Sequence, residues 1–321
     1  AGASPFTVSA GPGPGVASTT TSQGGNVTFD SGTGAFSYDP PAGYEGSDSF
    51  TYVVCDSGVP VPPLCSAALT VNLTVTDMIW FVDASAAAGG EGRLSAPFDC
   101  LTGAGCFNSS AHEAGDNIFL AQGSYTGPLT LLNDQKLIGD GSSGTLAGHT
   151  GITPATFSLA LPVFTGTDPV ITSTSNGVEL ASGNTVRGVT AGDSTSGYGF
   201  TGPSVGTLTV AESSVTGSGG AINLASGTVS ADFDTLSSTN STGFGILLSS
   251  INGSLAATSG SINNPTNSAV RILNSSPVVS YPGNITKNSA GRLFDIDGIG
   301  NGSSLSFSGT LGHVPPTGGG I

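Results

Sequence analysis

A short pattern recurs five times between residues 199 and 321: a small residue is followed by an apolar one, at intervals of 24, 24, 23 or 24, and about 27 residues. A second series of apolar marks lies between the first, at similar spacing. A repeat of this size with two strand marks cannot bury its own apolar face, so neighbouring units must stack. The repeat therefore predicts a β-solenoid. The first series is Ala221-Ile222, Gly245-Ile246, Ala269-Val270, Leu293-Phe294 and Gly320-Ile321, and the second begins at Gly206, Gly227, Gly253, Pro277 and Ser303.

The composition favours strands over helices throughout the chain. Glu and Lys together number seven, whereas there are 51 Gly and many β-branched residues. Only 8% of the residues are charged and 37% are hydrophobic, which is enough apolar surface for a packed core. We therefore expect an all-β protein.

The charge balance argues against nucleic acid as a partner. The net charge is −15, and the six basic residues are scattered singly, so no electropositive face for phosphates is expected. The chain has no run of 18 apolar residues and no charged-then-apolar leader before Ala1, so we expect neither a membrane span nor a signal segment. An acidic, Lys-poor, Ser/Thr-rich chain suits an extracellular setting at the cell surface.

The four cysteines form two close pairs in separate regions. Cys55 and Cys65 are ten residues apart, and Cys100 and Cys106 are six apart. Three pairings are possible, and the short spacings favour Cys55–Cys65 and Cys100–Cys106 as disulfides, in keeping with secretion. A structural zinc site is disfavoured because neither pair is Cys-x-x-Cys and no His lies at ligand spacing.

Residues 1–77 read as strands and turns, with strands expected at 25–30, 35–38, 47–55 and 67–76. The phrases at 34–40 and 43–54, followed by Asp56, resemble the C-terminal half of bacterial Ig-like or cadherin-like repeats of large surface proteins. The resemblance implies a β-sandwich module over 1–77. Because that family has further strands before this point, the module is either short or takes a missing strand from upstream sequence or from another subunit.

The phrases at 78–84, 95–99, 114–127 and 135–141 resemble the opening rungs of a right-handed parallel β-helix of the pectate-lyase-like kind. The resemblance implies a β-helix over 78–321, with a capping segment at about 97–115. In that family the cap is commonly an amphipathic helix, but the cysteines here predict a disulfide-pinned loop with at most a short helix. Residues 142–167 are expected to form a long loop off an early rung.

A search for catalytic residues finds no set of the polygalacturonase or pectate-lyase kind. Asp-Asp, Gly-His-Gly and Arg-x-Lys motifs are all missing, and no acidic cluster accompanies the arginines. The nearest pairs are Asp232 with Asp234 and Asp295 with Asp297. Two residues apart on a strand, the members of a pair share a face, but the two pairs lie more than two rungs apart and would not converge.

Calcium is the one cofactor that the sequence raises. Asp48, Asp56 and Asp77 flank strand ends of the sandwich, where cadherin-like relatives often bind calcium between modules. Asp295 and Asp297, near Asn301, form a second, looser candidate, since hard cations need six or more oxygens. Eight Asn-x-Ser/Thr sequons are present and leave glycosylation open: Asn26, Asn72, Asn108, Asn240, Asn252, Asn274, Asn284 and Asn301.

Together these features predict a non-enzymatic extracellular protein, a building block of a cell-surface adhesin, stalk or filament. Both ends of the chain look cut, so we expect partners to be copies of itself, added head to tail through exposed edge strands, or further domains of a longer chain. The alternative is a carbohydrate-active β-helix that cleaves or binds glycans. It predicts that one face gathers aromatic rings around a groove with three or more of Asp193, Asp232, Asp234, Asp295, Asp297 and Arg271.

Overall fold

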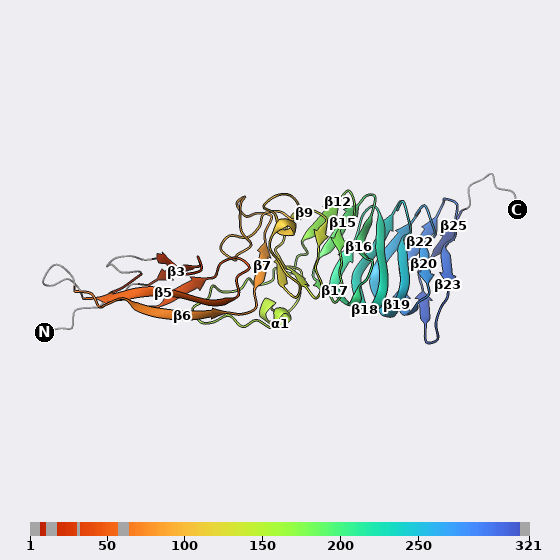
Figure 1. Cartoon of the computed structure of the whole chain (residues 1–321). Coiled ribbons are helices and arrows are strands. Elements are labelled where there is room, and N and C mark those ends of the chain that lie inside the picture. Colours follow the sequence, from red (N-terminus) through yellow and green to blue (C-terminus); the bar gives the residue numbers. More distant parts are fainter. Residues whose placement is uncertain (1–6, 11–17, 31–32, 57–63, 315–321) are drawn as a thin grey trace.

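The structure is a computed structural model that describes residues 7–10, 18–30, 33–56 and 64–314. It is elongated, with a β-sandwich at one end and a parallel β-solenoid of about 6 turns at the other (Figure 1). The predicted fold class is confirmed.

The described residues between 7 and 75 form the sandwich module, built of two antiparallel three-stranded sheets. One sheet has the order β1 (Thr7–Ala10), β5 (Gly46–Cys55), β6 (Leu69–Val75), and the other β2 (Ser18–Thr20), β3 (Asn26–Phe29), β4 (Phe36–Asp39). Alternating side chains from both sheets meet in one core, which contains Val27, Phe29, Tyr38, Phe50, Leu73 and Val75. The four expected strands are β3 to β6, and the sequence did not predict β1 and β2.

Residues 79–314 form the solenoid, whose strands stack in parallel on three sides. Side A contains β7 (Ile79–Val82), β8 (Asn117–Leu120), β11 (Lys136–Gly139), β14 (Thr185–Arg187), β21 (Ser276–Tyr281) and β24 (Ser304–Phe307). Side B contains β9 (Ser124–Thr126), β12 (Val170–Ser173), β15 (Thr190–Ser194), β22 (Asn284–Lys287) and β25 (Leu311–His313). Side C contains β10 (Leu129–Thr130), β13 (Val178–Glu179), β16 (Tyr198–Gly202), β20 (Val270–Leu273) and β23 (Phe294–Asp297). Three long strands turn corners and contribute to two or three sides: β17 (Gly206–Val215), β18 (Gly220–Thr239) and β19 (Ile246–Asn263).

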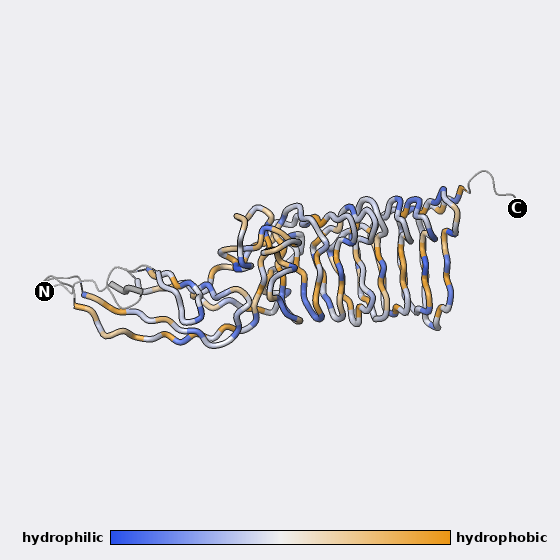
Figure 2. Tube along the Cα trace, turned by 45° about the horizontal axis from the view of Figure 1, so that its top comes forward, coloured by the Kyte–Doolittle hydropathy of each residue, from blue (hydrophilic) through white to orange (hydrophobic). Residues whose placement is uncertain are grey.

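The strand register confirms the repeat and sharpens its period. Ile222 pairs with Ile246, Ile246 with Val270, and Val270 with Phe294, so these rungs are 24 residues apart. The first three members are buried, and apolar segments recur at the same place in successive coils (Figure 2). The fifth mark, Gly320-Ile321, lies outside the described residues.

A cap closes the solenoid next to the sandwich module. The chain between β7 and β8 pairs with the first rung at Phe98 and carries a 3-10 helix, η1 (Phe107–Ser109). Phe98, Leu101 and Phe107 are buried in the end of the solenoid core. The segment is therefore a loop with one short helix.

A second loop, between β11 and β12, covers the outside of the first rungs of side A. It contains one short helix, α1 (Leu146–Thr150), and Leu146 packs on the outward side chains of Ile79, Phe81, Phe119 and Ile138. Strands β7 and β8 are therefore buried on both faces, which explains their continuous apolar sequences. The tip of the loop reaches the sandwich module at β4.

Candidate functional site

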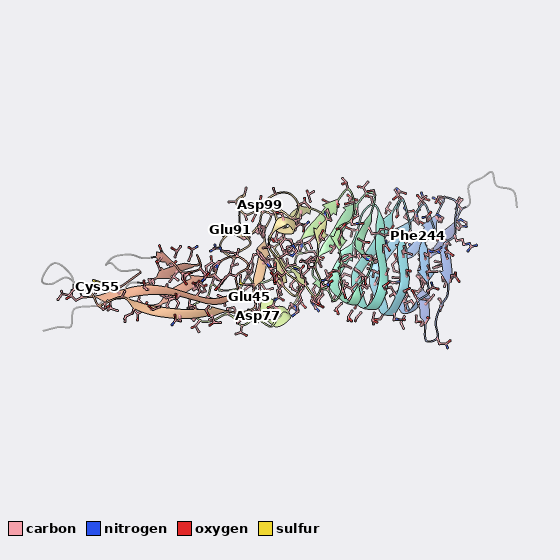
Figure 3. The ribbon with its side chains drawn as sticks, viewed as in Figure 1. Glu45, Cys55, Asp77, Glu91, Asp99 and Phe244 are labelled. Atoms are coloured by element: carbon pink, nitrogen blue, oxygen red, sulfur yellow. A yellow bond between two sulfur atoms is a disulfide. The ribbon has the colours of Figure 1, made fainter. Side chains whose placement is uncertain are left out.

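The two disulfides that we expected are formed, at opposite ends of the sandwich module. Cys55 at the end of β5 is bonded to Cys65, far from the solenoid (Figure 3). Cys100 is bonded to Cys106 within the cap. Both close short loops at module ends, which favours a structural role for them.

Among the calcium candidates, Asp48 is the only buried one, with 3% of its surface exposed. Its two oxygens accept hydrogen bonds from the hydroxyls of Thr21, Ser22 and Tyr38, at 2.5, 2.9 and 2.7 Å, and from the amides of Gln23 and Ser49. Burial raises the pKa of Asp48, but these hydrogen bonds outweigh it and lower the pKa to about 2. The carboxylate is thus ionised and its lone pairs are already used within the module.

The other candidates lie apart from one another. Asp56 accepts a hydrogen bond from the amide of Leu64 beside the Cys55–Cys65 bond, and Asp77 is exposed between the two modules (Figure 3). Asp295 and Asp297 lie on β23 near the other end of the molecule. In the described part of the chain, no three His, Cys, Asp or Glu residues are placed to hold a metal ion. Calcium binding at these positions stays a prediction.

The polar residues that do come together lie on side C of the solenoid. Asn223, Leu247, Arg271 and Asp295 occupy successive rungs in one register column, and all project outward because their strand neighbours face the core. Arg271 forms an ion pair with Asp295, which also lies 3.5 Å from Arg292. The register of 24 residues places each of these residues one rung from the next.

Two aromatic rings continue this surface. The Arg271 guanidinium lies 5.7 Å from the centre of the Phe244 ring, and the Tyr198 hydroxyl accepts a 3.2 Å hydrogen bond from the Phe244 amide. The Tyr198 ring crosses Gly220, where a Cβ atom would lie 2.3 Å from a ring carbon. Burial raises the pKa of the Tyr198 hydroxyl, so it stays protonated. We call Tyr198, Asn223, Phe244, Arg271 and Asp295 the side-C row.

The side-C row combines apolar rings with hydrogen-bond donors and acceptors, a mixture that suits a polyhydroxylated ligand such as a glycan. Three residues of the set that the carbohydrate reading required, Arg271, Asp295 and Asp297, lie on this side. Asp193 lies on β15 of side B, and Asp232 and Asp234 lie on β18, where it passes from side A to side B. The three hollows that the structure describes are lined by residues between 18 and 161, so none of them adjoins the row.

The sequence reading listed Arg271 and Asp295 separately and assigned Tyr198 and Phe244 mainly to the core. The signal that could have joined them was the period itself, because Asp295 follows Arg271 by 24 residues. The cation–ring contact joins neighbouring rungs in the same way.

Comparisons with known proteins identify the N-terminal part. Residues 4–76 match the family model of the bacterial Ig domain. No curated protein and no solved structure matches the chain. The chain thus carries a bacterial Ig domain followed by a parallel β-solenoid.

This combination, with two disulfides, fits an extracellular or surface protein in general. In the described ranges, no helix has the length and apolar character needed to cross a membrane.

Proposed function

We propose that this chain is a non-enzymatic structural protein of the cell exterior, a building block of an adhesin, stalk or filament that adds copies of itself through an open strand edge. The observation that carries the proposal is the difference between the two ends of the solenoid. Phe98, Leu101 and Phe107 cover the core beside the sandwich module. At the other end, no described residue covers the last rung.

The open end consists of β23, β24 and β25, each of which pairs with only one other strand among the described residues. Phe294, Leu305 and Phe307 are only partly buried there, and Ile296 and Leu311 are 41% and 48% exposed. Unpaired strand edges with apolar side chains are templates for addition of another chain. Because the opposite end of the solenoid is capped, the contact joins different surfaces on the two copies, and repeated contacts of that kind build a filament.

The experiment is size-exclusion chromatography with light scattering, together with electron microscopy, over a range of concentrations. We expect the chain to form linear assemblies, and the double variant Ile296→Lys with Leu311→Lys to remain monomeric. The matched control is Val163→Lys, at an 88% exposed apolar residue of the loop between β11 and β12. A wild-type chain that stays monomeric, or assemblies that persist in the double variant, would refute self-assembly.

The side-C row supports a second candidate function, glycan binding at the cell surface. Arg271, Asp295 and Asn223 offer charged and amide groups beside two aromatic rings. The test is binding of the chain to an array of immobilised glycans. Arg271→Met and Phe244→Ala should abolish a signal that survives Arg187→Met, which removes an arginine paired with Glu212 on side A. An equal signal for all of these variants rules out the row as the site.

A further inference from the structure

The loop of residues 140–166 between β11 and β12, which we call the latch, is fixed to the solenoid at both of its ends. The Asp140 carboxylate accepts hydrogen bonds from the Thr165 amide at 2.7 Å and from its hydroxyl at 2.9 Å, and the Gly166 amide donates to the Asp140 carbonyl. Helix α1 is capped by the Thr145 hydroxyl, which accepts from the Gly148 amide. With Leu146 1% exposed against side A, the base of the latch is part of the solenoid.

The tip of the latch belongs to the sandwich module. The Phe157 ring stacks on Phe36 with 5.1 Å between ring centres and packs against the sandwich core. The Tyr38 amide donates a 2.8 Å hydrogen bond to the Phe157 carbonyl, and Ser158 forms a parallel bridge with Tyr38. The latch therefore occupies the outer edge of β4 as a very short added strand. At this edge, the strand that we expected from upstream sequence or another subunit is supplied by the same chain.

Tyr38 links the latch to the interior of the sandwich module. Its backbone holds Phe157, while its hydroxyl donates to Asp48 on the opposite sheet. Asp48 in turn holds Thr21 and Ser22. Release of the latch would therefore uncover Phe36 and free the strand that anchors the buried carboxylate.

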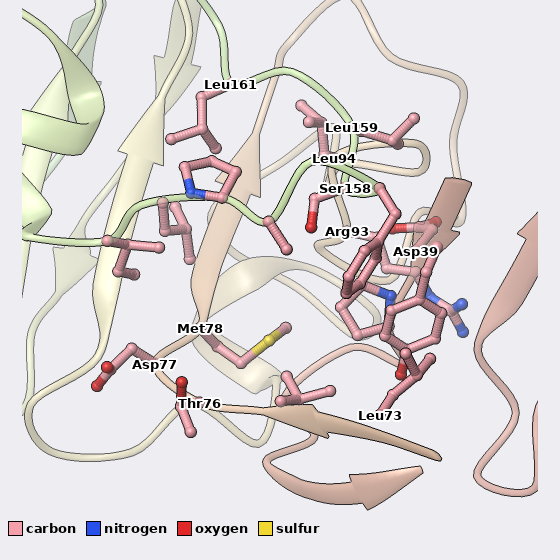
Figure 4. Close-up of a pocket in the computed structure, with 18 of the residues that line it drawn as sticks. Asp39, Leu73, Thr76, Asp77, Met78, Arg93, Leu94, Ser158, Leu159 and Leu161 are labelled. Atoms are coloured by element: carbon pink, nitrogen blue, oxygen red, sulfur yellow. The ribbon is translucent and has the colours of Figure 1, made fainter. Parts of the chain in front are cut away.

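Two further contacts cross the junction. Gly43, with φ +64°, lies against the ring of Trp80, where a Cβ atom would be 2.7 Å from a ring carbon. The Ser95 hydroxyl donates to the Asp39 carboxylate. Between these contacts lies an apolar cavity of about 230 Å³, with Leu73 and Met78 on one side and Leu94, Leu159 and Leu161 on the other (Figure 4).

We infer that the latch makes the sandwich module and the solenoid one rigid folding unit with a fixed angle, rather than two beads on a linker. A single chain connection leaves rotation free, whereas the latch, Trp80 and Ser95 add contacts at three separate points of the junction. The module also gains an aromatic side chain of its core from the solenoid, so its stability depends on the solenoid being folded. This inference is independent of the proposed function, since it holds for the single chain.

The test uses the full chain and the variant Phe157→Asp, with Val163→Asp as the control in the same loop. By calorimetry we expect the sandwich module of Phe157→Asp to unfold separately, about 10 °C below the wild-type transition. X-ray scattering should show a broader distribution of overall lengths, and Trp80 fluorescence should move to longer wavelength. The control should match the wild type in all three. If Phe157→Asp also matches the wild type, the latch does not hold the modules together.

Hydrogen exchange of the wild-type chain tests the inference without any variant, in case Phe157→Asp fails to fold. We expect the Tyr38 amide, which is bonded to the latch, to be protected within about tenfold of the Val27 amide inside the same sheet. A Tyr38 amide that exchanges a thousandfold faster than Val27 would show the latch to be open in the native chain and would overturn the inference.

Discussion

The Tyr38 hydroxyl donates a 2.7 Å hydrogen bond to the Asp48 carboxylate, and this bond joins the two sheets of the sandwich module. Tyr38 lies on β4 and Asp48 on β5, so each sheet contributes one partner. Both side chains are at least 95% buried, because 5% of Tyr38 and 3% of Asp48 is exposed. A buried carboxylate with five donors stabilises a fold only while it is ionised.

Acid should therefore weaken the sandwich module through Asp48. Its pKa in the folded chain is about 2, below the ordinary value of 3.8, so its contribution is complete above the ordinary value and is lost as the pH falls toward 2. We expect Asp48→Asn to lower the unfolding free energy by about 2 kcal/mol at neutral pH, and this difference to shrink between pH about 4 and about 2. Thermal unfolding at several pH values measures both effects. Asp297→Asn, at an exposed position, should show neither, and a pH-independent difference for Asp48→Asn would contradict the assignment.

Ile246 and Leu247 are neighbours on β19 with opposite orientations. Ile246 is 1% exposed in the core column between Ile222 and Val270, whereas Leu247 projects from side C. Ile246→Ala should cost about 3 kcal/mol, because it removes buried methyl groups and leaves a cavity. Leu247→Ala should cost less than about 1 kcal/mol. Urea unfolding followed by circular dichroism compares the two, and equal losses would contradict the orientation of this strand.

The Cys100–Cys106 bond closes a loop with a sequence separation of 6 in the cap. Replacing both cysteines by serine should cost about 2 kcal/mol, because the unfolded chain gains freedom. The ring of Phe98 lies 6.0 Å from that of Trp80, the one tryptophan of the chain, so loosening of the cap should shift the tryptophan emission to longer wavelength. Replacing Cys55 and Cys65 is the control, since that bond lies far from Trp80. An unchanged emission in the first variant would show that the cap holds without its disulfide.

Lys287 is a fully buried cation near the open end, with 0% of its surface exposed. Its ammonium donates to the carbonyls of Pro265, Thr266 and Asn267 and to the Ser289 hydroxyl, and burial lowers its pKa. Lys287→Met should cost about 3 kcal/mol, because three carbonyls lose their donor.

The control for this change is Arg292→Met. The Arg292 side chain is 77% exposed, and its removal should change the unfolding free energy by less than about 0.5 kcal/mol. Chemical unfolding of the two variants measures the difference. Similar values would mean that water replaces the ammonium without loss.

The sequence predicted what depends on local pattern. The repeat of apolar marks specified the rung period, and the alternation of residues located β3 to β6 and both disulfides. It located the latch only as a long loop, because the contact between Phe157 and Phe36 joins residues whose separation follows no period. Lys287 was listed only among scattered basic residues, since its burial depends on the path of the 265–267 turn in the rung before it. The alternation at Leu69–Val75 predicted one buried face, yet Leu69 is 45% exposed.

The 24-residue register has a consequence for how such a molecule changes length in evolution. An insertion or deletion of any other size within a rung would turn inward side chains outward and break three ladders at once. Duplication or loss of a whole rung leaves every ladder in phase, because Ile246 would meet its neighbour as Ile222 does now. Reach is thus a quantised trait of this fold, adjustable one strand spacing at a time.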